Sequence, residues 1–202
     1  LLLRDPARLR RLLNDEHRPV QLVVAGKAHP DDEEGKRMVQ EWVAFAQTPE
    51  CRHRVAFIED YDISMAQELV QGVDVWINTP LRPWEACGTS GMKGLVNGVL
   101  NLSVLDGWWA EAYEPGLGWA IEAGAEQAGG DRDQADAESL YALLEGEVVP
   151  AFYDRDASGV PRAWLQRIRR SMARLTPLFA GTRLLRDYLP KAYLPAITGY
   201  YS

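Results

Sequence analysis

Short hydrophobic runs rich in β-branched residues recur along the first 121 residues, and segments of helical periodicity separate them. Runs at 20–25, 54–58, 73–78 and 99–103 predict buried strands, and a last strand is expected at 119–121. Strands that alternate with helices at this spacing form βαβ units, whose strands lie parallel in one twisted sheet. The pattern therefore predicts the α/β class, with ligands bound beyond the carboxyl ends of the strands.

The chain changes character after the last of these strands. Residues 123–136 are small and polar and include glycine, so we expect an exposed loop there. Helical patterns follow at 139–149, 161–175 and 182–189. These segments are expected to cover the sheet rather than to extend it.

Size and charge exclude several classes of function. A chain of 202 residues is long enough for one α/β domain with a sizeable core, and its net charge of −7 argues against a nucleic-acid partner. No run approaches the roughly 18 apolar residues of a membrane-spanning helix, so no membrane partner is expected. Two cysteines, Cys51 and Cys87, cannot build a disulfide framework, which favours the cytoplasm. The three histidines and two cysteines lack metal-ligand spacing, and no metal site is predicted.

A glycine-rich turn follows the strand at 73–78 and leads into a helical segment. Its sequence, Glu-Ala-Cys-Gly-Thr-Ser-Gly-Met-Lys, occupies residues 85–93. The first amides of a helix lack partners and lie at the positive end of its dipole, so this turn can bind an anion. Lys93 lies just inside the helix, and a lysine amine can condense with a carbonyl group. An amine beside a phosphate site suggests pyridoxal phosphate, while the alternative is a tight turn followed by a solvated lysine.

The motif Glu-Ala-x-Gly-Thr-x-x-Met-Lys resembles the signature of the α-glucan phosphorylases, which act on glycogen, starch or maltodextrin. The continuation at 97–109 is similar to the shorter bacterial and archaeal branch of that family, and the resemblance runs from about residue 20 to about residue 122. It implies the C-terminal domain of a two-domain GT-B fold, with a Rossmann-like doubly wound parallel sheet. Residues 1–160 would form the cofactor- and glucose-binding domain and 161–202 its C-terminal helices. The chain would then be a C-terminal fragment without its N-terminal domain.

The resemblance also implies roles for the residues of the turn. Lys93 would carry pyridoxal 5′-phosphate covalently, and Thr89 and Ser90, with the amides of Ser90 and Gly91, would hold the cofactor phosphate. Tyr61 matches a tyrosine that lies near the cofactor in the family. The next residue departs from the longer enzymes, because an aspartate replaces an arginine that helps to neutralise this phosphate. That aspartate is expected to point away from the phosphate or to cap the following helix.

Three residues of the turn would contact the sugar. Glu85 would accept a hydrogen bond from a hydroxyl of the transferred glucosyl unit, a task that suits a carboxylate. Cys87 and Gly88 would approach the same unit through their backbone. Cys87 stands where many relatives carry serine, and Gly91 stands where the longer animal and plant enzymes carry asparagine. A nucleophilic role for Cys87 is not expected, because no histidine lies nearby in the motif to activate it.

The activity implied is retaining transfer of a terminal glucosyl unit from an α-1,4-glucan to orthophosphate, which releases α-glucose 1-phosphate. The family's main cluster of basic phosphate ligands precedes the first residue here, so the chain alone is expected to be inactive. Residues 164–193 would lie partly against the missing domain, and a homo-oligomer is among the assemblies that the resemblance allows. Two alternatives stay open: a nucleotide-sugar-dependent glucan synthase with the same architecture, and a carbohydrate-binding or regulatory module without chemistry.

Overall fold

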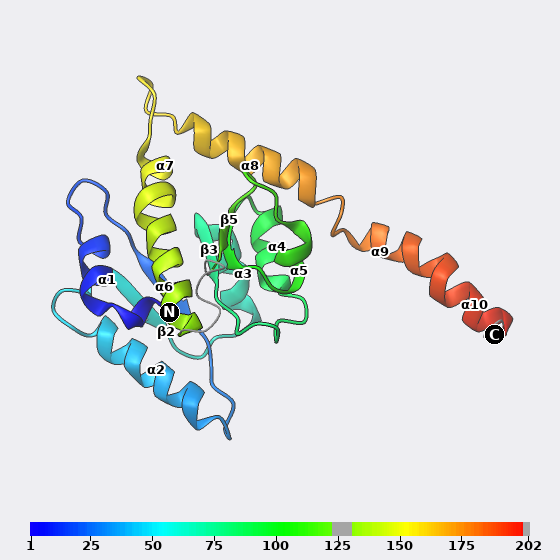
Figure 1. Ribbon diagram of the computed structural model, residues 1–202, viewed down its shortest axis with the longest axis horizontal. Coiled ribbons are helices and arrows are strands. Elements are labelled where there is room, and N and C mark those ends of the chain that lie inside the picture. Colours follow the sequence, from blue (N-terminus) through cyan, green and yellow to red (C-terminus); the bar gives the residue numbers. More distant parts are fainter. Residues whose placement is uncertain (123–130, 200–202) are drawn as a thin grey trace. The chain divides into compact units, whose positions relative to one another are not determined.

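The computed structural model describes residues 1–122 and 131–199 (Figure 1). The chain divides into two compact units. Unit 1 comprises Leu1–Gly72 and Ile121–Trp164, and unit 2 comprises Val73–Ala120 and Leu165–Ser202. Both units contain strands and helices, and each unit contains a parallel pair of strands, so the predicted α/β class is confirmed.

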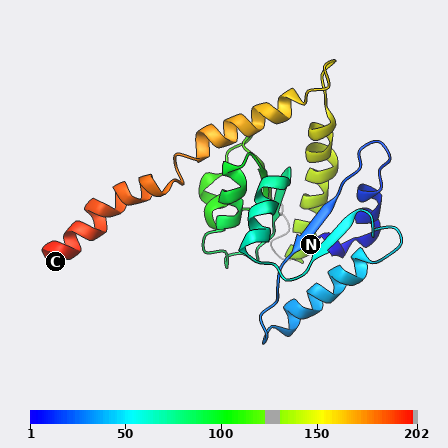
Figure 2. The ribbon, with the colours of Figure 1, turned by 180° about the vertical axis from the view of Figure 1, so that it is seen from behind.

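Unit 1 is built on two parallel strands, β1 (Leu22–Ala25) and β2 (Val55–Ile58), with Leu22 opposite Val55. Helix α2 (Glu33–Ala46) connects the two strands and packs against β2, as both ribbon views show (Figures 1 and 2). This is the βαβ unit that the alternating sequence pattern predicted. The other helical elements of unit 1 are η1 (Leu2–Arg4), α1 (Pro6–Leu13), α3 (Ile63–Gly72), α6 (Arg132–Leu143), η3 (Leu144–Val148) and α7 (Val149–Tyr153).

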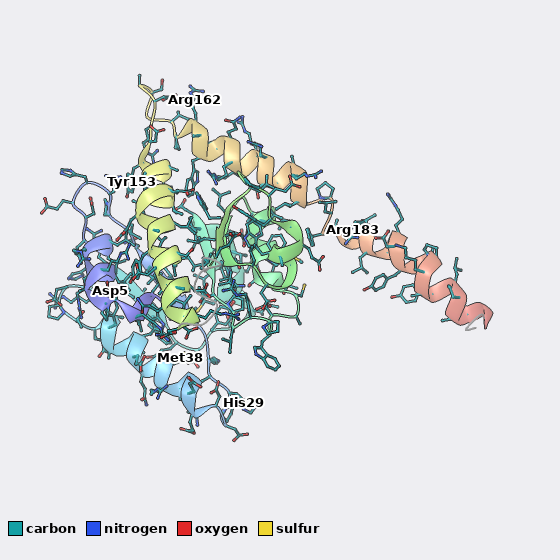
Figure 3. The ribbon with its side chains drawn as sticks, viewed as in Figure 1. Asp5, His29, Met38, Tyr153, Arg162 and Arg183 are labelled. Atoms are coloured by element: carbon teal, nitrogen blue, oxygen red, sulfur yellow. The ribbon has the colours of Figure 1, made fainter. Side chains whose placement is uncertain are left out.

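A buried tyrosine joins the beginning of the chain to α6. The hydroxyl of Tyr141 donates hydrogen bonds to the carbonyl oxygens of Leu2 at 2.6 Å and Asp5 at 3.0 Å. Burial raises the pKa of this hydroxyl well above its ordinary value, so the hydroxyl stays protonated as the two carbonyls require. Asp5, which is labelled in Figure 3, also caps α1, because its side chain accepts a hydrogen bond from the N–H of Arg8 at 2.9 Å.

Arg8 adds a charged link between α1 and the π-helical turn η3. Its guanidinium donates to Glu138 at 2.7 Å and, through two nitrogens, to Glu145 at 2.9 and 2.7 Å. The same group stacks over the ring of Tyr141, 4.7 Å from its centroid. The hydrogen bonds from Arg8 lower the pKa of the Glu145 carboxyl below its ordinary value. Arg8, near the start of the chain, is thereby fastened to α6 and η3, 130 and 137 positions later.

Unit 2 is built on a three-stranded sheet in the order β3-β4-β5. β3 (Val75–Asn78) and β4 (Leu100–Val104) are parallel with Val75 opposite Leu100, and β5 (Trp119–Ile121) flanks β4 and ends one residue beyond the unit. All five residues of β4 are buried, as expected for the central strand of a sheet. The helical elements of unit 2 are α4 (Thr89–Val96), α5 (Gly107–Ala112), most of α8 (Arg162–Leu175), α9 (Gly181–Tyr188), η4 (Leu189–Tyr193) and α10 (Leu194–Thr198).

Two adjacent tryptophans form the centre of the core of unit 2. Trp108 and Trp109 on α5 are buried, and they pack with Leu95 of α4 and Leu175 of α8. The indole N–H of Trp109 donates to the carbonyl oxygen of Trp119 at 3.0 Å, which ties α5 to β5. The two tryptophans therefore have a structural role, and α5 is fixed at the end of the sheet where the turn 85–88 lies.

The last helices of unit 2 expose an apolar surface, here called the C-terminal stripe. Arg183, labelled in Figure 3, marks α9, the first of its elements. The chain stays helical through Pro190 and Pro195, since Tyr188 and Tyr193, the residues before the two element boundaries, have right-handed helical dihedral angles. Pro190 lies in η4, which is a π-helical turn. The exposed residues of the stripe are Leu184, Leu185, Tyr188, Leu189, Tyr193, Leu194 and Ile197.

Two expectations from the sequence were wrong. The strands do not form one sheet, since the described residues place β1 and β2 in one sheet and the other three strands in a second. The expected loop at 123–136 is helical from Arg132 onward, because the Asp131 side chain accepts hydrogen bonds from the N–H groups of Asp133 and Gln134 and so begins α6. Residues 123–130 of that loop lie outside the described residues.

Candidate functional site

The turn predicted to bind an anion does end at the start of a helix. Gly88 is the N-cap of α4 with a φ of +88°, a left-handed conformation that favours glycine. Among residues 1–122 and 131–199, no side chain caps this end of α4. The first amides of a helix lack intrahelical acceptors, so the start of α4 is suited to an anion, although the N–H of Gly91 already donates to the Gly88 oxygen at 3.2 Å. Anion binding at this turn stays a prediction.

Lys93 and Thr89 lie on one face of α4. They are four positions apart, which on an α-helix brings side chains above one another, and both are exposed. Ser90 is half-buried. A ligand with a carbonyl group at one end and a phosphate at the other could therefore reach the Lys93 amine and the first amides of α4 from the same side.

Gly91 fills a position where no larger residue fits. A Cβ atom built on Gly91 would lie 2.5 Å from Oδ1 of Asn101 and 3.0 Å from the indole nitrogen of Trp108. The side-chain amide of Asn101, itself buried on β4, donates to the carbonyl oxygen of Gly91 at 3.1 Å. The first turn of α4 is thus fixed against β4 by a polar contact, and the sequence pattern gave no indication of the part that Asn101 plays.

The segment before α4 is fixed on the start of α5. Asp106 accepts a hydrogen bond from the N–H of Glu85 at 3.0 Å, and the N–H of Trp108 donates to the carbonyl oxygen of Cys87 at 2.8 Å. Between them lies Gly107, where a Cβ would come within 2.6 Å of the Cys87 oxygen and 2.8 Å of Cγ of Glu85. The predicted sugar-contacting residues are therefore held by a short segment that sequence analysis did not single out.

The side chain of Glu85 lies beside the cap of α4. Its Oε1 is 3.4 Å from the position that a Cβ on Gly88 would occupy, and the Trp108 ring is 3.0 Å from the same position. Glu85 is half-buried, whereas the Cys87 thiol is exposed. The structure thus brings Glu85, Cys87 and Gly88 together with the start of α4 in unit 2. Their roles toward a sugar stay predictions.

Tyr61 belongs to unit 1, where it joins β2 to α3 and is half-buried. The following residue, Asp62, accepts a hydrogen bond from the N–H of Met65 at 2.8 Å and so caps α3. The expectation that this aspartate caps the following helix is confirmed. The contact of Tyr61 with a cofactor stays a prediction.

A hollow of about 400 Å³ lies in unit 1 beyond the ends of β1 and β2. Lys27 and Lys36 line it, and both are paired: Lys27 with Asp60 at 3.6 Å and Lys36 with Glu33 at 2.6 Å. None of the predicted site residues lines this hollow. Its location agrees with the rule that ligands bind beyond the carboxyl ends of parallel strands.

Neither a metal-binding cluster nor a membrane-spanning helix occurs among the described residues. Within 1–122 and 131–199, no three or more histidine, cysteine, aspartate or glutamate side chains are grouped so that they could hold a metal ion. Over the same ranges, the helices are too short or too polar to cross a membrane.

Comparison with known proteins shows the family of this chain. The family model described as carbohydrate phosphorylase matches residues 5–115, which is more than half of the chain and includes the whole turn and α4. The chain is 51% identical over 193 residues to a glycogen phosphorylase of Aquifex aeolicus, a match that covers 96% of this chain and 28% of that protein.

Two other relatives are also named as phosphorylases. A glycogen phosphorylase of Mycobacterium bovis is 50% identical over 201 residues, covering 99% of this chain and 23% of the relative. A maltodextrin phosphorylase of Thermococcus litoralis is 42% identical over 198 residues, covering 98% and 23%. The chain thus spans about a quarter of the length of these relatives. Given the match of the family model across the turn, α4 and the strands on both sides of it, the chain belongs to the carbohydrate phosphorylase family.

Proposed function

We propose that the protein containing this chain is a pyridoxal-phosphate-dependent α-glucan phosphorylase of the cytoplasm. It transfers the terminal glucosyl unit of an α-1,4-glucan to orthophosphate and releases α-glucose 1-phosphate. The chain supplies the C-terminal, Rossmann-like domain of a two-domain GT-B fold. The observation that carries the proposal is the uncapped start of α4 with Lys93 and Thr89 on one exposed face. Relatives named glycogen phosphorylase and maltodextrin phosphorylase support it.

The start of α4 fits a phosphate ester that also carries an aldehyde. The exposed amine of Lys93 can form a covalent link with the aldehyde, while the Ser90 amide and the Thr89 hydroxyl can hold the phosphate. The Gly91 amide can join them by sharing or giving up its 3.2 Å hydrogen bond to the Gly88 oxygen. When bound, pyridoxal phosphate supplies a phosphate group that exchanges a proton with the substrate phosphate. Lys93 is then an anchor, and the helix start orients the group by its amides and its dipole.

Glu85 and its neighbours orient the sugar. A carboxylate can accept two hydrogen bonds from hydroxyls in a fixed geometry, and Glu85 lies beside the cap of α4 where a bound phosphate would be. Cys87 and Gly88 contact the glucosyl unit through backbone groups, because the Cys87 thiol is a weak donor.

The C-terminal stripe is assigned to an internal contact of the longer protein. Seven large apolar side chains on α9, η4 and α10 are exposed in this chain, and exposed apolar surface of that extent marks an interface. We assign it to contact with the N-terminal domain, which also supplies most of the positive charge for the two phosphates. The chain alone therefore lacks part of the active site.

The deciding experiment is borohydride reduction of the full-length protein, followed by intact-mass measurement and peptide mapping. We expect the mass of one reduced pyridoxal phosphate on Lys93, together with phosphorolysis of maltodextrin. Lys93→Ala abolishes both, whereas Lys36→Ala, a matched lysine on α2, retains both. The same assay detects no glucose 1-phosphate with the 202-residue chain alone. Adduct-free wild type that extends a glucan from ADP-glucose would favour the synthase alternative instead.

A further inference from the structure

Asp106 has both carboxylate oxygens engaged by backbone amides. Oδ1 accepts from the N–H of Gly107 at 2.9 Å, which caps α5, and Oδ2 accepts from the N–H of Glu85 at 3.0 Å. The second bond joins positions 21 residues apart. Asp106 therefore does more than cap a helix, since it also ties the predicted sugar-contacting segment to the end of β4.

The segment 85–88 touches the start of α5 at two further points. The N–H of Trp108 donates to the Cys87 oxygen at 2.8 Å, and Gly107, with a φ of +52°, leaves no room for a Cβ between Cys87 and Glu85. Of the two hydrogen bonds that hold segment 85–88 to this end of α5, the one to Asp106 is accepted by a side chain and the one from Trp108 joins backbone groups. A substitution at 106 can therefore loosen the segment without changing Gly107 or Trp108.

The position and orientation of the Glu85 carboxylate depend on the hydrogen bond from the N–H of Glu85 to Asp106. Cγ of Glu85 lies 2.8 Å from the position that a Cβ on Gly107 would occupy, and Oε1 lies 3.4 Å from the corresponding position at Gly88. The side chain is half-buried beside these two glycines, so the direction of its carboxylate depends on the backbone at 85. A shift of that backbone by a fraction of an ångström changes the hydrogen-bond geometry that the carboxylate offers.

We propose that Asp106 is a positioning residue that sets the Glu85 carboxylate for hydrogen bonding to the transferred glucosyl unit, an inference that rests on the proposed phosphorylase function. Asp106 itself contacts neither sugar nor cofactor. It acts by holding the N–H of Glu85, so its contribution is realised through Glu85 alone. The cofactor site at the start of α4 is bound to β4 separately, through Asn101.

Two substitutions separate this role from helix capping. Asp106→Asn keeps the size but places a donor against one of the two N–H groups, and Asp106→Ser can still cap α5 but is too short to serve both amides. In full-length protein we expect each to lower kcat/KM for glucan synthesis from glucose 1-phosphate by about 10- to 100-fold, the range for a hydrogen bond to a charged group. The borohydride-reduced adduct on Lys93 stays stoichiometric.

The matched control is Asp131→Asn. Asp131 also accepts from two backbone amides, those of Asp133 and Gln134, but at the start of α6 in unit 1. We expect this variant to keep the wild-type kcat/KM. Hydrogen exchange of the peptide containing residues 84–88 gives a readout independent of activity, because loss of the tie accelerates exchange there in the Asp106 variants and not in the control.

A double-mutant cycle with Glu85→Gln gives the decisive result. If Asp106 acts through Glu85, adding Asp106→Asn to Glu85→Gln lowers kcat/KM little further. In addition, the ratio of kcat/KM for glucose 1-phosphate to kcat/KM for its single-deoxy analogues is smaller in the Asp106 variants than in wild type. Independent losses, unchanged discrimination, or loss of the Lys93 adduct in the Asp106 variants would each overturn the inference. A wild-type protein without phosphorolysis would instead overturn the proposed function on which it rests.

Discussion

Oδ1 of Asn101 lies 2.5 Å from the point where a side chain at position 91 would begin. The same asparagine donates its amide N–H to the Gly91 carbonyl at 3.1 Å. One buried side chain on β4 therefore both requires glycine in the first turn of α4 and fixes the backbone of that turn.

Gly91→Ala is expected to destabilise the chain although alanine favours helix over glycine. Overpacking against Asn101 and Trp108 costs about 1–3 kcal/mol, which exceeds the gain in helix propensity of about 1 kcal/mol. Gly94→Ala is the control, because a Cβ there meets Val99 at an ordinary 3.4 Å. Urea unfolding measures both. Equal free energies of unfolding for Gly91→Ala and wild type would contradict the packing described. Added to Gly91→Ala, Asn101→Ala should recover part of the lost free energy of unfolding, because it removes the side chain that the new Cβ meets.

A pH-dependent contribution to stability is expected from Glu145. Its pKa in the folded chain is lowered below the ordinary 4.5 by the hydrogen bonds from Arg8, so the ion pair stabilises the fold above 4.5. That contribution is lost as the pH falls through the lowered pKa, because protonation removes the charge. Since the Glu145 side chain is 39% exposed, solvent screening keeps the effect near the surface range, about 1 kcal/mol or less.

Glu145→Gln isolates this effect. The difference in unfolding free energy between wild type and Glu145→Gln should be largest at neutral pH and should shrink as the pH is lowered below 4.5. Chemical denaturation at a series of pH values gives the measurement, and a constant difference for Glu145→Gln would refute the assignment.

The C-terminal stripe predicts opposite results in the short chain and in the full-length protein. Leu184→Ser with Leu185→Ser should change the unfolding free energy of the 202-residue chain by only about 0.5 kcal/mol, since both side chains are already exposed. In the full-length protein the same pair should cost several times more, because it removes apolar area from a buried contact. Limited proteolysis within 181–198 offers a second measurement. Equal cleavage in both proteins would contradict an internal contact.

The local parts of the fold were predictable from sequence, and the non-local parts were not. Alternating apolar runs predicted all five strands within a few residues, because strand and helix periods are local properties. The division of those strands between two sheets depends on which strands pair, and no single run carries that information. The start of α6 had a local signal in Asp131, a favoured N-cap residue, but the small polar residues before it favoured a loop.

The same distinction between local and non-local signals applies to the candidate site. The motif predicted the turn, the glycine cap and the position of Lys93 one turn inside α4, since each is encoded by consecutive residues. Asn101 and Asp106 escaped notice because their partners lie 10 and 21 positions away. An Asp-Gly pair directly after a buried strand is a usable signal for a cap, yet only the structure reveals that the same carboxylate also holds Glu85.

The bond from Glu85 to Asp106 closes a loop that contains α4 and β4, so the candidate site draws its shape from one continuous stretch of chain within unit 2. Closing a loop of this length costs little more conformational entropy than closing one half as long. The hydrogen bonds that shape the turn, from Glu85 to Asp106, Trp108 to Cys87 and Asn101 to Gly91, all join residues of this one stretch. Transplanting residues 85–108 as a block would therefore carry these contacts with it.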